Sequence, residues 1–361
     1  MNENAIAFSE KYLKIAFTPP DLAWNWKIRN KLFKDFFDRY NLDKYVDVIE
    51  PEPAEEDELL LIHDSKFIGY VKKKSETGIG YLDYGDTPAY KGIYEDATLV
   101  VGGTAKLAKL ILKGRYKKGF NPQGGFHHAQ KSSAAGFCVF NDVALAAMLA
   151  SRENLRVAVI DIDGHHGDGT QFILYDKPLL KISFHRYGHF YPGTGDVDEL
   201  GEGEGYGYSV NIPFPSGAGD DAFEIALKEL VIPLLENYKP EFIIAQMGVD
   251  AHLGDLLVDL RLTSKSYKLF GQTLRHIAEK HAQGKILGLG GGGYDPDNTS
   301  RMWMIMISEI FDIPEDVRRR IYEELRDKPE GTFSTEHVIK IVKFRIDKLK
   351  ENLRKAGLLL E

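Results

Sequence analysis

From about residue 155 onward, the chain alternates short apolar runs with longer stretches of helical spacing. Four runs are hydrophobic on both faces: RVAVIDI at 156–162, LLKISF at 179–184, FIIAQMGV at 242–249 and KILGLG at 285–290. Such runs are typical of the buried strands of a parallel sheet, in which the intervening helices form the crossovers. The pattern therefore predicts an α/β fold.

Two other segments have distinct patterns. The apolar residues of 26–37 recur at near-helical spacing, which predicts an amphipathic helix with an ordinary packing role. Segment 193–217 is dense in Gly and Pro and predicts a long irregular loop between two strands. Long loops in compact domains are usually functional. Because no Ser- and Pro-rich linker divides the chain, we expect one domain and not two.

The last part of the chain carries its own helical pattern. After the breaker KPEG at 328–331, apolar residues follow a 4-4-3-4 spacing within a highly charged stretch, at Val338, Val342, Ile346, Leu349 and Leu353. This predicts an amphipathic helix that packs on the body, with a contact between subunits as the alternative. We therefore divide the chain into a main domain, 1–313, and a C-terminal helical extension, 314–361.

Composition and charge narrow the class of protein. The 361 residues are 43% hydrophobic and 28% charged, as in soluble globular proteins. A net charge of −8 removes the general attraction that nucleic-acid binding needs, so we expect no nucleic-acid partner. The single cysteine, Cys138, cannot form an internal disulfide, and the N-terminus does not resemble a signal peptide. Since no apolar run approaches a membrane span, the sequence predicts a cytoplasmic protein.

Histidines cluster in the middle of the chain, where six of the eleven lie between 127 and 189: His127, His128, His165, His166, His185 and His189. The motif DIDGHHGDG ends the strand predicted at 156–162, and alternation places Asp161, Asp163 and His165 on one side. Ligands bind at the carboxyl ends of parallel strands, and Asp with His suits zinc. A catalytic zinc normally has three protein ligands, and Asp250 at the end of another strand is the best third candidate. The alternative is a capping aspartate and a surface histidine.

The tandem histidines His127 and His128 follow two glycines in GGFHHA. Near a metal, one neutral imidazole can take a proton from water while the other delivers a proton to a leaving group. Each ring then needs a carboxylate partner to fix its tautomer, and Asp161 and Asp168 are available. Alone, such a pair would be read as a packing element, but the neighbouring metal motif favours acid–base chemistry.

The glycine-rich segment LGLGGGGYDP at 287–296 formally contains GxGxxG at Gly288, Gly290 and Gly293. We reject a dinucleotide site, because that fingerprint must open a helix, whereas Tyr-Asp-Pro follows here at once. The glycines instead predict a tight loop that presents Tyr294 to the same cleft, where a phenol can donate a hydrogen bond to a developing oxyanion. A structural loop tyrosine is the alternative.

Together, these motifs resemble a known family. GGFHHA with GFC, DIDGHHGDG, SFH, YPGTGD, QMGVD and LGGGGYD occur in the order and approximate spacing of the zinc-dependent histone deacetylase superfamily, over roughly residues 15 to 310. Segments such as DTPAYKGIYEDA are most similar to its bacterial and archaeal acetoin-utilisation branch. The resemblance implies a single-domain, three-layer arginase/deacetylase fold, in which helices flank a central parallel sheet of about eight strands, and makes 1–313 the catalytic domain.

The resemblance also implies roles for individual residues. One zinc ion per chain is bound by Asp163, His165 and Asp250. Zinc and Tyr294 polarise the acetyl carbonyl while His128 deprotonates the attacking water, and either His128 or His127 protonates the departing amine. Asp161 pairs with His127, and Asp168 pairs with His128. Asp161 and Ser183 supply side-chain ligands of a structural monovalent cation, which is expected to be potassium.

Substrate-binding residues follow from the same resemblance. Phe137 and Tyr191 form aromatic walls of a narrow channel, Gly136 belongs to the same GFC motif, and Asp86 is a rim acid for the substrate backbone. The chain departs from the family in having Tyr191 where phenylalanine is common and Gly164 where an aliphatic side chain is usual. We expect Cys138 to be a small packing residue, and His185 and His189 to be structural.

The function expected from these residues is zinc-dependent hydrolysis of N-acetyl-lysine in proteins, with release of acetate. Alternatives are a deacetylase of small acetylated amines or polyamines and a non-catalytic protein that binds acetylated ligands. An arginase-like enzyme with two manganese ions is disfavoured, because QMGVD lacks the second aspartate of a bridging cluster. The sequence leaves open the physiological substrate, the choice between zinc and iron, and the oligomeric state.

Overall fold

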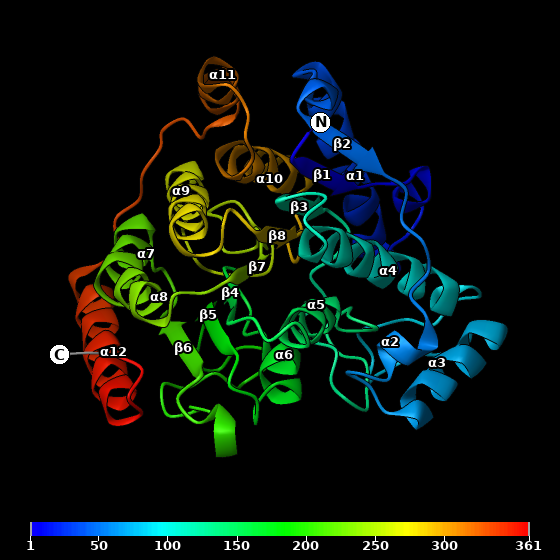
Figure 1. Cartoon of the computed structure of the whole chain (residues 1–361), viewed down its shortest axis with the longest axis horizontal. Helices are drawn as coiled ribbons and strands as arrows, with labels where there is room; N and C mark the ends of the chain where they lie inside the picture. Colours follow the sequence, from blue (N-terminus) through cyan, green and yellow to red (C-terminus); the bar gives the residue numbers. More distant parts are fainter. Residues whose placement is uncertain (1, 360–361) are drawn as a thin grey trace.

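The computed structural model describes residues 2–359, which form one sheet of eight parallel strands (Figure 1). The strand order is β2-β1-β3-β8-β7-β4-β5-β6. In chain order the strands are β1 (Asn4–Ala7), β2 (Val46–Ile49), β3 (Lys118–Asn121), β4 (Val157–Asp161), β5 (Leu180–Arg186), β6 (Ser209–Phe214), β7 (Phe242–Gln246) and β8 (Ile286–Leu289).

Helices cover both faces of the sheet, so the predicted three-layer α/β fold is confirmed (Figure 1). Helices α4 and α5 pack on one face, whereas α9 packs on β7 and β8 from the other face, and α10 lies between α9 and α1. The helices are α1 (Pro20–Arg39), α2 (Glu56–Leu59), α3 (Ser65–Thr77), α4 (Ile93–Leu112), α5 (Asp142–Ser151), α6 (Asp168–Ile173), α7 (Asp220–Ala226), α8 (Ile232–Tyr238), α9 (Ser264–His281), α10 (Pro296–Ile310), α11 (Glu315–Leu325) and α12 (Glu336–Lys355).

The four apolar runs become the strands β4, β5, β7 and β8, and β4, β7 and β8 are buried along their whole length. The prediction of an irregular loop over 193–217 is wrong for its last third, which forms β6. This strand lies at the edge of the sheet, where Pro213 is tolerated because one side of the strand has no partner strand. The prediction missed β6 because it was based on the high Gly and Pro content of the whole segment, and this content does not exclude a short strand within it.

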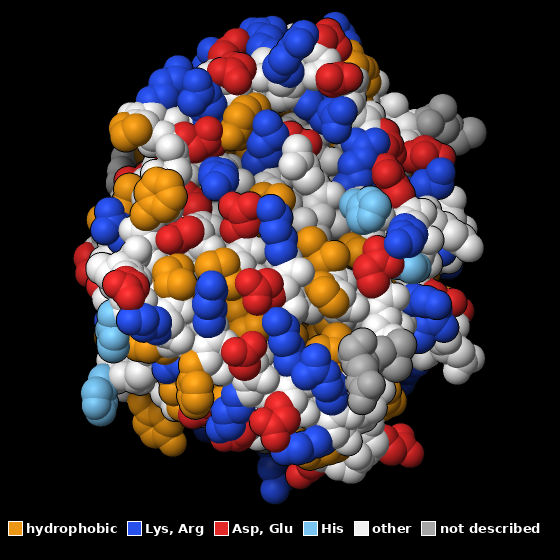
Figure 2. Space-filling model, turned by 90° about the vertical axis from the view of Figure 1, so that its left-hand side faces the viewer, with side chains coloured by type: hydrophobic (Ala, Val, Ile, Leu, Met, Phe, Trp, Pro, Cys, Tyr) orange, Lys and Arg blue, Asp and Glu red, His pale blue; other side chains and the backbone are white. Residues whose placement is uncertain are grey.

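The C-terminal helix α12 packs against β6 and α7, and the five apolar residues that predicted it are all buried. It therefore covers the edge strand of the sheet. Figure 2 looks onto the side of the molecule that is at the left of Figure 1, where α12 lies, and shows charges of both signs among small groups of hydrophobic side chains. Within residues 2–359, no helix is long and apolar enough to cross a membrane.

Candidate active site

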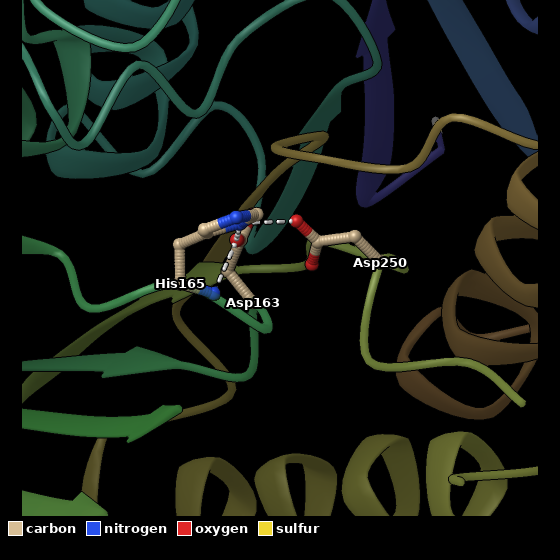
Figure 3. Close-up of side chains that lie close together, drawn as sticks. All are labelled: Asp163, His165 and Asp250. Carbon is tan, nitrogen blue, oxygen red and sulfur yellow. Dashed lines mark hydrogen bonds and ion pairs between the residues drawn. The ribbon is translucent and has the colours of Figure 1, made fainter. Parts of the chain in front are cut away.

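Loops at the carboxyl ends of β4 and β7 bring together Asp163, His165 and Asp250 (Figure 3). Their ligand atoms all lie within 4.8 Å of one another. Nδ1 of His165 is 2.7 Å from Oδ2 of Asp250 and 3.5 Å from Oδ1 of Asp163. Since β4 ends at Asp161, strand alternation does not extend to Asp163 and His165. A turn groups them instead, in which the amide of each donates to the carboxylate two residues earlier at 3.0 Å.

Neighbouring donors orient the two carboxylates of this group. Oδ2 of Asp163 accepts hydrogen bonds from the side chain of Gln246 and the amide of Gly292, both at 2.8 Å, and Oδ1 of Asp250 accepts one from the amide of Gly164. Burial and the nearby Asp163 carboxylate raise the pKa of Asp250 to about 7. Two buried carboxylates beside an imidazole fit a divalent cation such as Zn²⁺, with positions left for water or substrate.

Both predicted histidine–carboxylate pairs are present beside this group. Nδ1 of His127 lies 2.7 Å from Asp161, and Nδ1 of His128 lies 2.6 Å from Asp168. The carboxylates accept these hydrogen bonds, so Nδ1 carries the proton in each ring and Nε2 remains for proton transfer. Burial lowers the pKa of His128 to about 4. Burial opposes charge on His127 as well, but Asp161 and Asp163 outweigh it and raise the pKa of His127 to about 9.

A cavity of about 320 Å³ opens onto this cluster. It includes all four predicted substrate-binding residues and two that the sequence analysis missed, Phe190 and Leu257. The Phe190 ring stacks on the His165 ring at a centroid distance of 4.9 Å. The lining residues are Asp86, His128, Gly136, Phe137, His165, Phe190, Tyr191, Leu257 and Tyr294.

One wall of the cavity depends on two consecutive residues with left-handed backbone conformations. Gly136 and Phe137 have φ angles of 53° and 67°. A Cβ atom on Gly136 would lie 2.6 Å from Cδ2 of His128, so only glycine allows this close approach. The amide of Phe137 donates to Oγ1 of Thr87 at 3.1 Å, which ties this wall to the loop that carries Asp86.

The Tyr294 ring meets the Phe137 ring edge to face, with ring centroids 6.0 Å apart. Its burial raises its pKa, which keeps the hydroxyl protonated. The carboxylate of Asp255 accepts a hydrogen bond from the Tyr294 amide at 2.8 Å. The carbonyl of the preceding residue, Gly293, accepts one at 2.9 Å from the fully buried guanidinium of Arg29. The tyrosine is therefore held through its backbone from two sides.

The sequence analysis did not identify Arg29 or Asp255, although the position of Arg29 within the predicted helix indicates that it is unusual. It falls at helical spacing between Trp26 and Phe33, on the apolar face of the helix predicted at 26–37. The structure places its guanidinium over the Trp26 ring, 3.4 Å from the centroid. A positive charge on a buried helix face needs a specific environment, so it marks a position with more than a packing role.

The remaining predicted residues also have defined positions. Asp161 and Ser183 are partners in the register of β4 and β5, and both line a small internal cavity of about 10 Å³. Cys138 is buried with its thiol 3.3 Å from the Gly136 carbonyl. His185 is buried with Nε2 2.9 Å from the Gly195 carbonyl, whereas His189 is exposed.

Gly164, which stands where the family usually has an aliphatic side chain, lies directly against Val258. A Cβ atom on Gly164 would lie 2.7 Å and 2.9 Å from the two methyl carbons of Val258. Val258 belongs to the loop after Asp250 and fills the space next to the turn that carries Asp163 and His165. The space that a side chain at residue 164 would occupy is therefore filled by Val258 from another loop.

Comparison with known proteins agrees with this architecture. A model of the histone deacetylase domain matches residues 27–310. The acetoin utilization protein AcuC of Bacillus subtilis is 38% identical over 275 residues, covering 72% of this chain and 71% of that protein. The AcuC protein of Staphylococcus aureus strain MRSA252 is 34% identical over 325 residues, covering 87% of this chain and 83% of that protein.

A eukaryotic relative and a solved structure extend the similarity. The histone deacetylase HDAC1 of Drosophila melanogaster is 33% identical over 277 residues, covering 73% of this chain and 51% of that protein. The crystal structure of the HDA15 HD domain superposes with a TM-score of 0.81 at 29% identity, covering 100% of this chain and 99% of that one. The chain therefore belongs to the histone deacetylase superfamily, in the acetoin-utilisation branch that its motifs predicted.

Proposed function

We propose that the chain is a zinc-dependent deacetylase that hydrolyses the amide of N-acetyl-lysine side chains in proteins. The observation that carries the proposal is the cavity that ends on His165 of the Asp163, His165 and Asp250 group, with His128 and Tyr294 also in its wall. This arrangement combines a metal-ligand set, a neutral base and a phenol donor around one small volume.

Asp163, His165 and Asp250 are the residues that would hold the zinc ion, one per chain. When bound, zinc supplies Lewis-acid polarisation of a carbonyl and lowers the pKa of a water molecule. Burial of the two carboxylates supports this assignment, because their mutual repulsion is relieved by a divalent cation. We also propose that Asp161 and Ser183 contribute to a monovalent cation site, expected to take potassium, since both line the small cavity between β4 and β5.

The two histidines take different roles because their environments separate their pKa values. His128 is neutral at pH 7 and accepts the proton of the attacking water at Nε2. His127, whose proton Asp161 and Asp163 stabilise, is suited to protonate the amine as the C–N bond breaks and acetate forms. The hydroxyl of Tyr294 donates a hydrogen bond to the oxygen of the former acetyl carbonyl, on which negative charge develops.

The channel walls favour a lysine-like substrate. Phe137 and Tyr191 present aromatic rings that suit a methylene chain, and Asp86 at the same cavity can accept hydrogen bonds from backbone amides. Tyr84, two residues before Asp86, and Leu256, next to Leu257, are both exposed and offer apolar contacts to a polypeptide. A small acetylated amine would use none of these outer contacts, so we favour a protein substrate over a free amine.

The test is acetate release from an acetyl-lysine peptide and from acetylated small amines, using zinc-loaded protein and a chelator-stripped control. Peptide turnover that is lost on chelation and restored by zinc supports the proposal. Turnover of free amines alone would assign the enzyme to small-molecule metabolism. Stoichiometric zinc binding without turnover of either substrate would favour the non-catalytic binding protein. Tyr294→Phe is the matched variant, because it removes one hydroxyl and leaves the three metal ligands intact.

A further inference from the structure

The segment that joins α11 to α12, residues 326–335, has no regular secondary structure (Figure 1); we call it the strap. It lies outside the residues matched by the histone deacetylase domain, 27–310, and within the predicted extension. The strap contacts both ends of the segment that joins β7 to α9 after Asp250, residues 251–263, which we call the β7–α9 loop. These contacts connect the C-terminal part of the chain to the metal-ligand region.

At the start of the β7–α9 loop, the strap contacts His252. The amide of Gly254 donates to Nδ1 of His252 at 3.1 Å, so the proton of the neutral ring is on Nε2. Nε2 lies 3.1 Å from Oδ2 of Asp327 in the strap and donates to it. The same carboxylate accepts hydrogen bonds from the Ser264 amide at 2.7 Å and, through Oδ1, from Arg301 at 3.2 Å.

At the end of the loop, the strap contacts Thr263. The amide of Gly331 donates to Oγ1 of Thr263 at 3.2 Å. The amide of Thr332 donates to Oδ2 of Asp220 at 2.9 Å, and Asp220 also accepts from the Thr263 amide at 2.9 Å. Asp220 is buried and joins the strap to the end of the loop through these two hydrogen bonds. The strap thus fixes the loop at both of its ends.

Three residues of the β7–α9 loop contact the cavity or the residues that form it. Asp255 accepts the hydrogen bond from the Tyr294 amide, Leu257 lines the cavity, and Val258 packs against Gly164 beside the metal-ligand turn. Their positions depend on the path of the loop, which contains no helix or named strand between Ala251 and Thr263. Its two ends pair with each other at a bridge between His252 and Leu262, where the Leu253 amide donates to the Leu262 carbonyl at 2.8 Å. The strap therefore contacts the loop at ends that also pair with each other, and its side-chain contacts add to this backbone pairing.

We propose that the strap positions the β7–α9 loop for catalysis, with Asp327 acting through His252. Neither residue lines the cavity, so both are positioning residues. Loss of the Asp327 carboxylate removes the side-chain contact at the start of the loop and leaves only its backbone pairing, so Asp255 then holds Tyr294 less firmly. The activity part of this inference rests on the proposed deacetylase function, whereas the effect on the loop does not.

The experiment compares Asp327→Asn and His252→Phe with the wild-type full-length chain. The second variant removes both the Nε2 donor and the Nδ1 acceptor of the Gly254 amide, and it keeps a ring against Tyr267, on which His252 is stacked. Asp327→Asn leaves the contact with Gly254 in place. Val342→Ala is the control, because it leaves a void in α12 and lowers stability without touching the loop. The measurements are amide hydrogen exchange of residues 251–263, thermal unfolding, and kcat and KM on an acetyl-lysine peptide.

We expect both test variants to exchange loop amides about tenfold faster and to lose about tenfold in kcat, with a smaller change in KM, because a hydrogen bond to a charged group is removed. Val342→Ala is expected to unfold at a lower temperature with wild-type loop exchange and kcat. Unchanged loop exchange in folded test variants, or an equal loss of kcat in the control, would overturn the proposal. If the loop exchanges faster but the wild-type protein hydrolyses no acetylated substrate, the positioning role stands and the proposed function fails.

Discussion

The carboxylate of Asp255 accepts a hydrogen bond from the backbone amide of Tyr294 at 2.8 Å, although the two residues belong to loops that follow different strands. The other carboxylate oxygen accepts one from the Leu257 amide at 2.9 Å. One partly buried side chain therefore fixes the backbone of both Tyr294 and Leu257, which line the cavity. It does so through the backbone, which leaves the Tyr294 hydroxyl free to face a substrate.

Substitution of Asp255 by alanine is expected to lower kcat by about ten- to a hundredfold, the equivalent of about 1.5–3 kcal/mol for a hydrogen bond to a charged group. KM on an acetyl-lysine peptide should change much less, because the group lost does not touch substrate. Steady-state kinetics measure both values. Asp259→Ala on the same loop is the control, since its carboxylate accepts from Ser216 on the outside of the loop. Equal losses in the two variants would contradict a specific role for Asp255.

Much of the fold was predictable because a central strand is buried on both faces, so nearly all of its residues are apolar. The runs that became β4 and β7 are apolar on both faces, and the 4-4-3-4 spacing from Val338 to Leu353 specified α12. β1 to β3 were not read from the pattern, since each has only four residues and lies among amphipathic segments. β6 was missed because an edge strand needs less regular alternation and tolerates Pro213.

The site was predictable where the chemistry is local in sequence. Asp163 and His165 share one motif, and His127 and His128 are adjacent, so their types and spacing indicated a metal and a proton relay. Asp255 carries no such signal, because its function depends on an amide 39 residues away. The contact of Val258 with Gly164 could not be predicted from the sequence either, because only the fold brings these two loops together.

Removal of a metal ligand should separate metal binding from proton transfer. Asp250→Asn is expected to lower zinc affinity and activity by more than about a hundredfold, because even residues that only orient a ligand contribute about 10- to 100-fold. His128→Ala should retain zinc and lose about 10²- to 10⁴-fold in kcat, the usual contribution of a general base. Metal analysis of the purified variants, together with acetate release, checks both. Zinc loss from His128→Ala would place that histidine among the ligands instead.

The complementarity of Gly164 and Val258 predicts a compensating pair of substitutions. Gly164→Ala should destabilise the protein by about 1–3 kcal/mol, because the added methyl meets the Val258 side chain and extra volume in a packed region forces it to shift. Val258→Ala in the same chain opens that space and is expected to recover most of the loss. Denaturant unfolding of the two single variants and the double variant gives the coupling free energy, expected to exceed about 1 kcal/mol. Strict additivity would show that Val258 is not what excludes a side chain at residue 164.

Acid should destabilise the protein through His63, which supports the loop that carries the histidine pair. The amide of Asn141 donates to Nε2 of His63 at 3.0 Å, and Nδ1 lies 2.9 Å from the Gln130 carbonyl, so the neutral ring uses both nitrogens. Asn141 in turn donates to the carbonyl of His127 at 3.3 Å. Protonation of Nε2 removes the acceptor for the Asn141 amide and places a charge in the core.

Burial lowers the pKa of His63 from 6.5 to about 4, which fixes the sign of this effect. Above pH 6.5 the ring is neutral in both states and pH has no effect through this group. Between pH 6.5 and 4 only the unfolded chain binds the proton, so the free energy of unfolding falls as pH falls, by roughly 3 kcal/mol in total. Other buried histidines titrate as well, so the measurement is the difference between wild type and His63→Gln in urea unfolding at pH 7, 6, 5 and 4.5. The glutamine amide can both donate and accept but does not titrate, so this variant should lose less stability over the range; parallel curves would mean that His63 retains an ordinary pKa in the folded protein.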